Sequence, residues 1–249
     1  RSGNPPDIAY IPQPGLLATL VKDTGKVQPV ADSVAANIDK WFGEDWKAYG
    51  TVDGKVYSVG DADLPFTIQS ISKPFTFGLA LETFGHRRVA EHVSVEPSGD
   101  AFNAISLQSG TNRPHNPMIN AGAITVTALL HSRFGGEAFD IVLDRLSVAA
   151  GRQLSVDEAV FESERRTGHR NRAIAHLLLN FGMVHTQAED ALDIYFRQCA
   201  ILVTCRDLAL MGATLANMGR NPLSGHAAYE IGSVRSMLAI MFTCGMYDY

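Results

Sequence analysis

The chain has 249 residues, of which 46% are hydrophobic and 19% are charged, so it is long enough to bury a substantial core and too apolar to be disordered. Its formal charge is −5, and it has no long basic run that could follow a phosphate backbone, so nucleic acid is not an expected partner. The apolar runs stop well short of the roughly eighteen residues that a membrane-spanning helix needs, and we therefore expect no membrane segment.

The chain contains three cysteines, Cys199, Cys205 and Cys244. An odd number without C-x-x-C or Cys/His spacing indicates neither a disulfide framework nor a zinc site, so we expect no metal and no cofactor. Free cysteines fit the cytoplasm, with the mitochondrial matrix as the alternative. The opening "RSGNPPD" lacks an initiator Met and a signal peptide's apolar core, which favours a processed product or a fragment.

The first 50 residues mix Pro-punctuated turns with short helical patterns, and we treat 1–50 as a separate N-terminal region. The next stretch, "AYGTVDGKVYSVGD", is clearer. Asp53-Gly54 lies between alternating apolar and polar residues, which is the strongest short signal for a β-hairpin. An antiparallel sheet is therefore expected to begin here, at the start of a domain covering 51–249.

From Ser70 onward the hydrophobic pattern is mostly helical. Glycines typical of helix C-terminal caps follow several segments: Gly85, Gly135, Gly151 and Gly182. Two helix starts carry capping-box patterns: Ser155-x-x-Glu158 and Thr204-x-x-Asp207. The intervening segment 96–122 is long, polar and rich in Gly, Pro and Asn, as functional loops often are.

The stretch "FTIQSISKPF", residues 66–75, joins an expected strand to the first of these helices. Thr67, Ser70 or Ser72 could simply cap the helix, and Pro74 suits its first turn. The alternative is the pattern Ser70-x-x-Lys73, in which a lysine one helical turn away can take the serine's proton. Chance alone gives about 0.4 Ser-x-x-Lys matches in this composition, so both interpretations stay open on the motif by itself.

Three further clusters each have a structural and a functional interpretation. "PHNPMINAGAI" places Asn116 and Asn120 before an apolar helix, where asparagine usually caps or turns but could also present its amide to a substrate. "FESERRTGHRN" has the charge pattern of a solvated helical face, although a carboxylate and an amide there could hold an amino acid. Tyr195 and Tyr247 lie in apolar stretches, where most tyrosines are core residues.

With these stretches assembled, the chain from about Thr51 to Tyr249 resembles the serine-dependent glutaminases. The resemblance is carried by collinear motifs: "TVDGKVYSVGDADLPFTIQSISKPF", "EPSG", "NPMINAGAI", "SERRTGHRN", "YFRQCAILVTCRDLALMGATLANMG" and "CGMYDY". Several independent motifs in the same order are far more specific than Ser-x-x-Lys alone.

The resemblance implies an α/β (α+β) fold of the serine β-lactamase/DD-peptidase type, an antiparallel sheet flanked by helices. It also implies hydrolysis of L-glutamine to L-glutamate and ammonia without metal or organic cofactor. In this mechanism Ser70 is the nucleophile, Lys73 is its base and Tyr247 shares the proton transfer. The positions that match the family's substrate-binding residues are Ser70, Asn120, Glu164, Asn171, Tyr195 and Tyr247.

The chain departs from the family pattern at two places. Ser33 stands where an ungapped count from "TVDG" expects the tyrosine of a "YIP" motif, while the "YIP" that does occur begins at Tyr10, 23 residues too early. The family also continues past "CGMYD" with strands that carry a Lys-Ser-Gly motif, whereas Lys73 is the last lysine here. We therefore expect a glutaminase domain that is incomplete at its C-terminus and lacks the C-terminal strands.

The leading hypothesis is a glutaminase that forms a homo-oligomer, either a dimer or a tetramer. One alternative is another Ser-Lys amidohydrolase, related to penicillin-interactive proteins. A second is a catalytically silent glutaminase-like fragment that acts through association with other chains, which the Ser33 substitution and the missing strands favour.

Overall fold

The computed structural model describes residues 50–52, 55–57, 60–101 and 103–245. The chain divides into two compact units, one formed by residues 1–64 with 204–209 and the other by residues 65–203 with 210–249. The first unit contains the predicted hairpin. Strands β1 (Gly50–Val52) and β2 (Lys55–Tyr57) pair antiparallel with Val52 opposite Lys55, which confirms the prediction around Asp53-Gly54, although those two turn residues lie outside the described ones.

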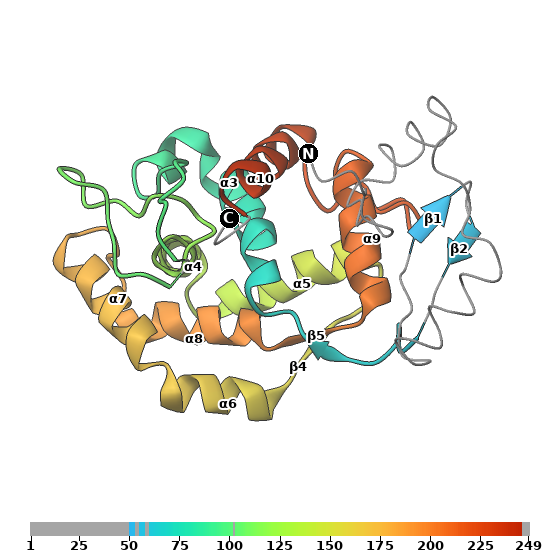
Figure 1. Ribbon diagram of the computed structural model, residues 1–249, viewed down its shortest axis with the longest axis horizontal. Coiled ribbons are helices and arrows are strands. Elements are labelled where there is room, and N and C mark those ends of the chain that lie inside the picture. Colours follow the sequence, from blue (N-terminus) through green and yellow to red (C-terminus); the bar gives the residue numbers. More distant parts are fainter. Residues whose placement is uncertain (1–49, 53–54, 58–59, 102, 246–249) are drawn as a thin grey trace, which may run out of the picture. The chain divides into compact units, whose positions relative to one another are not determined.

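The second unit is rich in helices and has a small antiparallel sheet, as expected for the predicted fold class (Figure 1). In that sheet the order is β3-β5-β4, with Thr67 of β3 and Ser155 of β4 both opposite Leu202 of β5. The bounds of the strands are β3 Phe66–Thr67, β4 Ser155–Val156 and β5 Ile201–Val203. The α-helices are α3 Ser72–Ala90, α4 Asn120–Phe134, α5 Ala138–Ala150, α6 Glu158–Thr167, α7 His169–Asn180, α8 Ala188–Cys199, α9 Cys205–Ala216 and α10 Ile231–Cys244, and the 3-10 helices are η1 Gln69–Ile71 and η2 Gly135–Glu137.

Helix α4 is the central element of the second unit. Its sequence from Asn120 to Leu130, "NAGAITVTALL", is buried on every side, as expected for a helix whose residues are small or apolar all round. Helices α8, α3 and α7 pack against it, and in Figure 1 it is seen almost end-on between them. The core that α4 forms with α7 and α8 therefore fixes the relative positions of the helices that carry the candidate site residues.

The predicted helix ends at glycines are largely confirmed. Gly135 and Gly151 are the C-caps of α4 and α5 with positive φ, and Gly182 follows the end of α7 with φ +68°. Gly85, with φ +76°, breaks α3 internally, so that the predicted end is a kink within a longer helix. Glycine is suited to these positions because it has no Cβ to clash at positive φ.

The predicted helix starts have mixed outcomes. The Thr204-x-x-Asp207 capping box is confirmed, because the Thr204 N–H donates to Asp207 Oδ2 at 2.7 Å and the Asp207 N–H donates to Thr204 Oγ1 at 3.2 Å. The Ser155-x-x-Glu158 box is wrong: Ser155 belongs to β4, and the N-cap of α6 is Asp157, whose Oδ1 accepts from the Val160 N–H at 3.0 Å. Ser155 pairs with Leu202 in the sheet, so its backbone belongs to the strand and the residue does not serve as the helix N-cap.

The capping interpretation of "FTIQSISKPF" is also wrong. Helix α3 begins at Ser72 and its N-cap is Ile71, which offers no side-chain acceptor. No side chain caps η1 either, where Ile68 holds the N-cap position. The hydroxyls of this stretch are therefore available for other contacts, while Pro74 lies in the first turn of α3 as predicted.

Candidate functional site

Ser70 lies on a sharp corner between β3 and α3. The strand pairing continues to Ile68, whose N–H donates to the Ile201 carbonyl at 2.8 Å, and the chain then turns through Gln69 into η1 and α3. Gln69 has φ +49°, a left-handed conformation that costs a residue with a side chain free energy. Ser70 directly follows this strained residue and is partly exposed. The predicted arrangement of strand, serine and helix is thus present.

Lys73 is buried one helical turn after Ser70, and its side chain is 1% exposed. Its Nζ donates to the Met118 carbonyl at 2.9 Å and to Asn120 Oδ1 at 2.8 Å. Both acceptors are uncharged oxygens, so they offset only part of the cost of burying an ammonium group. Burial accordingly lowers the pKa of Lys73 from its usual 10.5 to about 8. About a tenth of the molecules would then hold a neutral lysine at pH 7, which is the form that can accept a proton.

Asn120 connects Lys73 to Asn171. It is the first residue of α4, and its Nδ2 donates to Asn171 Oδ1 on α7 at 3.0 Å. Asn116 instead has the turn-forming role that asparagine usually takes, because its Oδ1 accepts from the backbone N–H groups of Met118 and Ile119. The two asparagines of "NPMIN" therefore have different functions, and only Asn120 reaches the lysine.

Tyr195 projects from α8 into the core and is 3% exposed. One helical turn further on, the buried thiol of Cys199 lies close enough to Tyr195, Ser72, Lys73 and Glu164 for each of them to influence its pKa. Burial raises the pKa of Cys199 to about 12, so the thiol stays protonated at neutral pH. In the sequence, Cys199 stands out only as a free cysteine, although its i, i+4 spacing from Tyr195 places both side chains on one face of α8.

The structure thus gathers most of the predicted residues around Lys73. Lys73, Asn120 and Asn171 form one hydrogen-bonded chain, while Glu164 and Tyr195 both lie near enough to Cys199 to influence its pKa. These side chains come from five helices: α3, α4, α6, α7 and α8. Tyr247 lies outside the described residues, as do Ser33 and Tyr10, so their predicted roles stay predictions.

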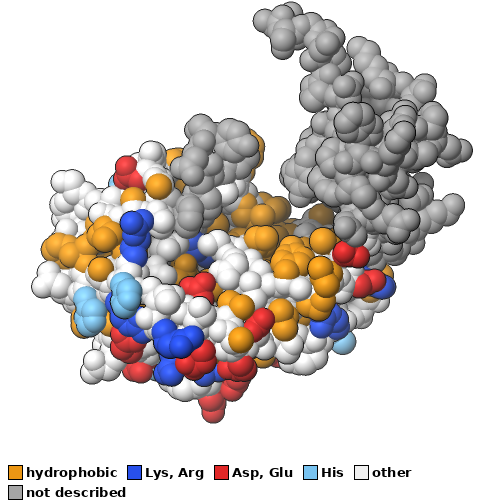
Figure 2. Space-filling view, turned by 60° about the horizontal axis from the view of Figure 1, so that its bottom comes forward, with side chains coloured by type: hydrophobic (Ala, Val, Ile, Leu, Met, Phe, Trp, Pro, Cys, Tyr) orange, Lys and Arg blue, Asp and Glu red, His pale blue; other side chains and the backbone are white. Residues whose placement is uncertain are grey.

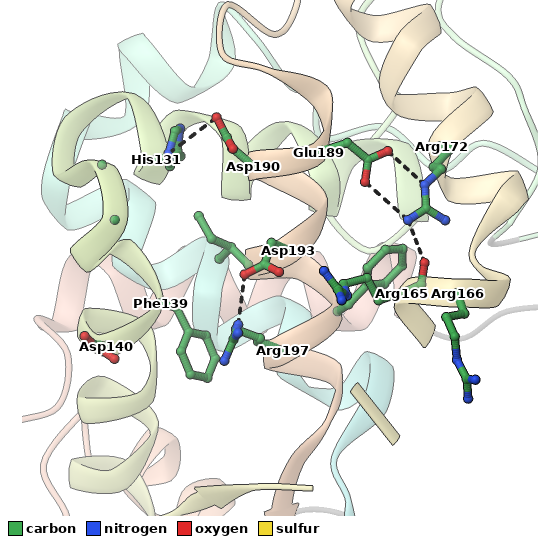
Figure 3. Close-up of a pocket in the computed structure, with 14 residues that line it drawn as sticks. His131, Phe139, Asp140, Arg165, Arg166, Arg172, Glu189, Asp190, Asp193 and Arg197 are labelled. Carbon is green, nitrogen blue, oxygen red and sulfur yellow. Dashed lines mark hydrogen bonds and ion pairs between the residues drawn. The ribbon is translucent and has the colours of Figure 1, made fainter. Parts of the chain in front are cut away.

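A pocket of about 600 Å³ elsewhere on the second unit contains neither Ser70 nor Lys73 (Figure 3). Two of its guanidinium groups already have carboxylate partners: Arg172 binds Glu189 at 2.8 Å, and Arg197 binds Asp193 at 2.8 Å. Figure 2 likewise shows Lys and Arg side chains interleaved with Asp and Glu on one face of the molecule. The buried lysine and its partners are therefore a better candidate for chemistry than this charged pocket.

Neither a metal centre nor a membrane helix is found in the part of the chain that the structure describes. Within residues 50–52, 55–57, 60–101 and 103–245, His, Cys, Asp and Glu side chains do not gather in groups of three or more that could bind a metal ion. Over the same residues, none of the helices combines the length and apolar character needed to cross a bilayer.

A partly exposed serine at a strained corner, one turn before a buried lysine, on a helix-rich unit with an antiparallel sheet, is the arrangement of the serine β-lactamase-like class. The sequence model of the Glutaminase family matches residues 35–249. The chain belongs to the glutaminase family.

Individual relatives agree with this assignment. A glutaminase of Nostoc sp. is 48% identical over 235 residues, covering 94% of this chain and 66% of the relative. Glutaminase 2 of Bradyrhizobium diazoefficiens is 55% identical over 199 residues, covering 80% of this chain and 32% of the relative. The chain thus spans about two thirds or less of the length of these curated relatives.

Solved structures agree as well. A probable glutaminase of Bacillus subtilis has a TM-score of 0.74 at 37% identity, covering 78% of this chain and 63% of that one. The structure described as Mglu in its glutamate form has a TM-score of 0.76 at 41% identity, covering 96% of this chain and 56% of that one. The β-lactamase-like fold predicted from the sequence is therefore confirmed.

Proposed function

We propose that the protein hydrolyses L-glutamine to L-glutamate and ammonia through an acyl-enzyme on Ser70. The observation that carries the proposal is Lys73: a lysine that is 1% exposed, with a pKa of about 8, one turn after a serine at a strained corner. Burial is the largest cause of this lowered pKa, and perturbed pKa values of this kind are common at catalytic sites. L-glutamine is proposed as the substrate because the relatives are named glutaminases. Mglu, a solved structure with the same fold, is described in its glutamate form, and glutamate is the product of the proposed reaction.

In the proposed reaction, neutral Lys73 removes the Ser70 hydroxyl proton as Ser70 Oγ attacks the side-chain carbonyl carbon of glutamine. The new O–C bond forms, the C–N bond breaks, and the proton leaves with the nitrogen as ammonia. Water then attacks the ester, and glutamate is released with Ser70 restored. Tyr247 shares the proton transfer with Lys73, and the Ser70 N–H donates to the developing oxyanion.

The remaining predicted residues bind the amino-acid end of glutamine. Glu164 would pair with the ammonium group, because it is a partly exposed carboxylate that lies near enough to Cys199 to influence its pKa. Asn120, Asn171 and Tyr195 would donate to the α-carboxylate. The Asn120–Asn171 hydrogen bond would hold one amide in place for this role while Asn120 Oδ1 binds Lys73.

Three broader statements belong to the same proposal. Residues 51–249 belong to the catalytic domain and follow a separate region of residues 1–50. The protein acts as a homo-oligomer, a dimer or a tetramer, and its compartment is the cytoplasm. All three derive from the family resemblance and the cysteine pattern of the sequence.

Covalent labelling separates this proposal from its alternatives. We expect a glutamine-derived diazoketone to modify Ser70, with the modified residue located by mass spectrometry of the digested protein. Ser70→Ala should abolish the modification, whereas Ser163→Ala, at an exposed serine on α6, should leave it unchanged. Labelling by penicillin instead would indicate a different Ser-Lys amidohydrolase. A folded protein that reacts with neither reagent would favour a catalytically silent chain.

A further inference from the structure

The turn that carries Ser70 is held by hydrogen bonds from the junction between α8 and β5. Before the corner, the Ile68 N–H donates to the carbonyl of Ile201, the first residue of β5. After the corner, the side chain of Gln198, near the end of α8, contacts Ser72 and Thr76 of α3. Gln198 and Ile201, only three positions apart, therefore contact the chain on both sides of the strained turn.

The strained residue itself is held by Ser72. The Gln69 carbonyl accepts from both the Ser72 N–H and the Ser72 Oγ, the latter at 2.7 Å. Because Gln69 has φ +49°, this carbonyl would relax toward a more favourable conformation if its donors were lost. Ser70 is attached directly to this carbonyl, so any such relaxation would move the Ser70 N–H and hydroxyl.

Gln198 determines the direction in which the Ser72 hydroxyl donates its hydrogen bond. Its Nε2 donates to Ser72 Oγ at 3.2 Å, and its Oε1 accepts from Thr76 Oγ1 at 3.1 Å. A hydroxyl has a single hydrogen, so when Ser72 Oγ accepts from Gln198 its own hydrogen points to the Gln69 carbonyl. Gln198 and Ser72 are both fully buried, where an unmade hydrogen bond is costly. The hydrogen-bonded network of Ser72, Thr76 and Gln198 is therefore rigid.

We infer that Gln198 is a positioning residue that acts through the Ser72 hydroxyl to hold the strained Gln69 turn and so aim Ser70 at the substrate. The inference rests on the proposed role of Ser70 as the nucleophile. Gln198 touches neither the substrate nor the reacting atoms in this account. Its effect should therefore appear in the rate of acylation rather than in the affinity for glutamine.

The kinetic test uses Gln198→Met, Ser72→Ala and the double variant, each measured for kcat and KM with L-glutamine. We expect kcat to fall about tenfold or more in each single variant, because small displacements of a nucleophile are costly, while KM changes by less than about twofold. If Gln198 acts through Ser72, the double variant is no slower than the slower single variant. Losses that multiply in the double variant would overturn the inference.

A matched control distinguishes positioning from general destabilisation. Thr214 is also fully buried, and its Oγ1 donates to the Ala149 carbonyl at 2.9 Å, away from the Ser70 corner. Thr214→Val should lower stability yet leave kcat unchanged. If Gln198→Met lowers stability and leaves kcat unchanged as well, the inference is wrong. Should Gln198→Met fail to fold, Ser72→Ala, which loses one hydroxyl, must still lower kcat for the inference to hold.

Amide hydrogen exchange tests the same inference without any turnover. The peptide covering residues 68–73 includes the Ser72 N–H that donates to the Gln69 carbonyl. Gln198→Met and Ser72→Ala should speed its exchange, and Thr214→Val should not. A wild-type protein that releases no ammonia would refute the proposed function, yet faster exchange at residues 68–73 in the two variants would still support the positioning role of Gln198. Unchanged exchange in the variants would overturn that positioning role.

Discussion

Replacing Lys73 by methionine should remove a specific pH dependence of stability. The fall of the Lys73 pKa from 10.5 in the unfolded chain to about 8 in the folded protein corresponds to about 3 kcal/mol, since one pKa unit is worth about 1.4 kcal/mol. Below pH 8 the lysine is protonated in both states, so the folded protein bears the whole penalty of burying the charge. Between pH 8 and 10.5 only the unfolded chain keeps the proton, and the free energy of unfolding therefore rises with pH.

Urea denaturation of the wild type and of Lys73→Met at several values of pH from 7 to 10.5 measures this effect. The difference between their free energies of unfolding should move in favour of the wild type by about 3 kcal/mol over that range. Taking the difference cancels the contributions of the other titrating groups to the free energy of unfolding. Arg87→Met, which removes a cation whose side chain is 94% exposed, should show no such pH-dependent difference. A flat difference for Lys73→Met would refute the claim that burial lowers the pKa of Lys73.

Two predictions concern local structure and need only urea or thermal denaturation. Asp157→Ala should cost about 1 kcal/mol through loss of the N-cap of α6, whereas Ser155→Ala, at the position where the capping box was first predicted, should change stability by less than about half of that. A larger loss for Ser155→Ala would mean that the cap has been assigned to the wrong residue. Gly122→Ala should cost about 2 kcal/mol or more, because a Cβ there would lie 1.9 Å from the Asn116 carbonyl oxygen. Gly212→Ala, where a Cβ would meet nothing within 4 Å, should be neutral or stabilising, and equal effects of the two would contradict this close packing.

Local patterns in the sequence predicted the corner at Ser70 well. The strand expected before Ser70, the Ser-x-x-Lys spacing and Pro74 describe a strand that turns into a helix, and the structure contains both elements. The hairpin around Asp53-Gly54 and the capping box at Thr204 were equally predictable, because each depends on residues within a few positions of one another. The helix start at Asp157 was missed because β4 has only two residues, too few to show an alternating pattern.

Tertiary contacts around the site could not be predicted from such patterns. Lys73 and Asn120 are 47 residues apart, and Gln198 and Ser72 are 126 residues apart, so no helical or strand period connects either pair. The family resemblance supplied Asn120 as a site residue, but nothing in the sequence indicated that its Oδ1 binds the lysine. Gln198 was missed, and Cys199 was noted only as a free cysteine, since a buried amide or thiol on a helix reveals its role only when its partners are known.

The most direct test of the account is release of ammonia and glutamate from L-glutamine by the purified protein, with Ser70→Ala and Ser163→Ala measured beside it. The account predicts release by the wild type and by Ser163→Ala, and none above background by Ser70→Ala, because the nucleophile is gone while the fold is kept. Circular dichroism of each variant establishes that it is folded. Equal release by the wild type and Ser70→Ala, or none from a folded wild type, would contradict the central claim.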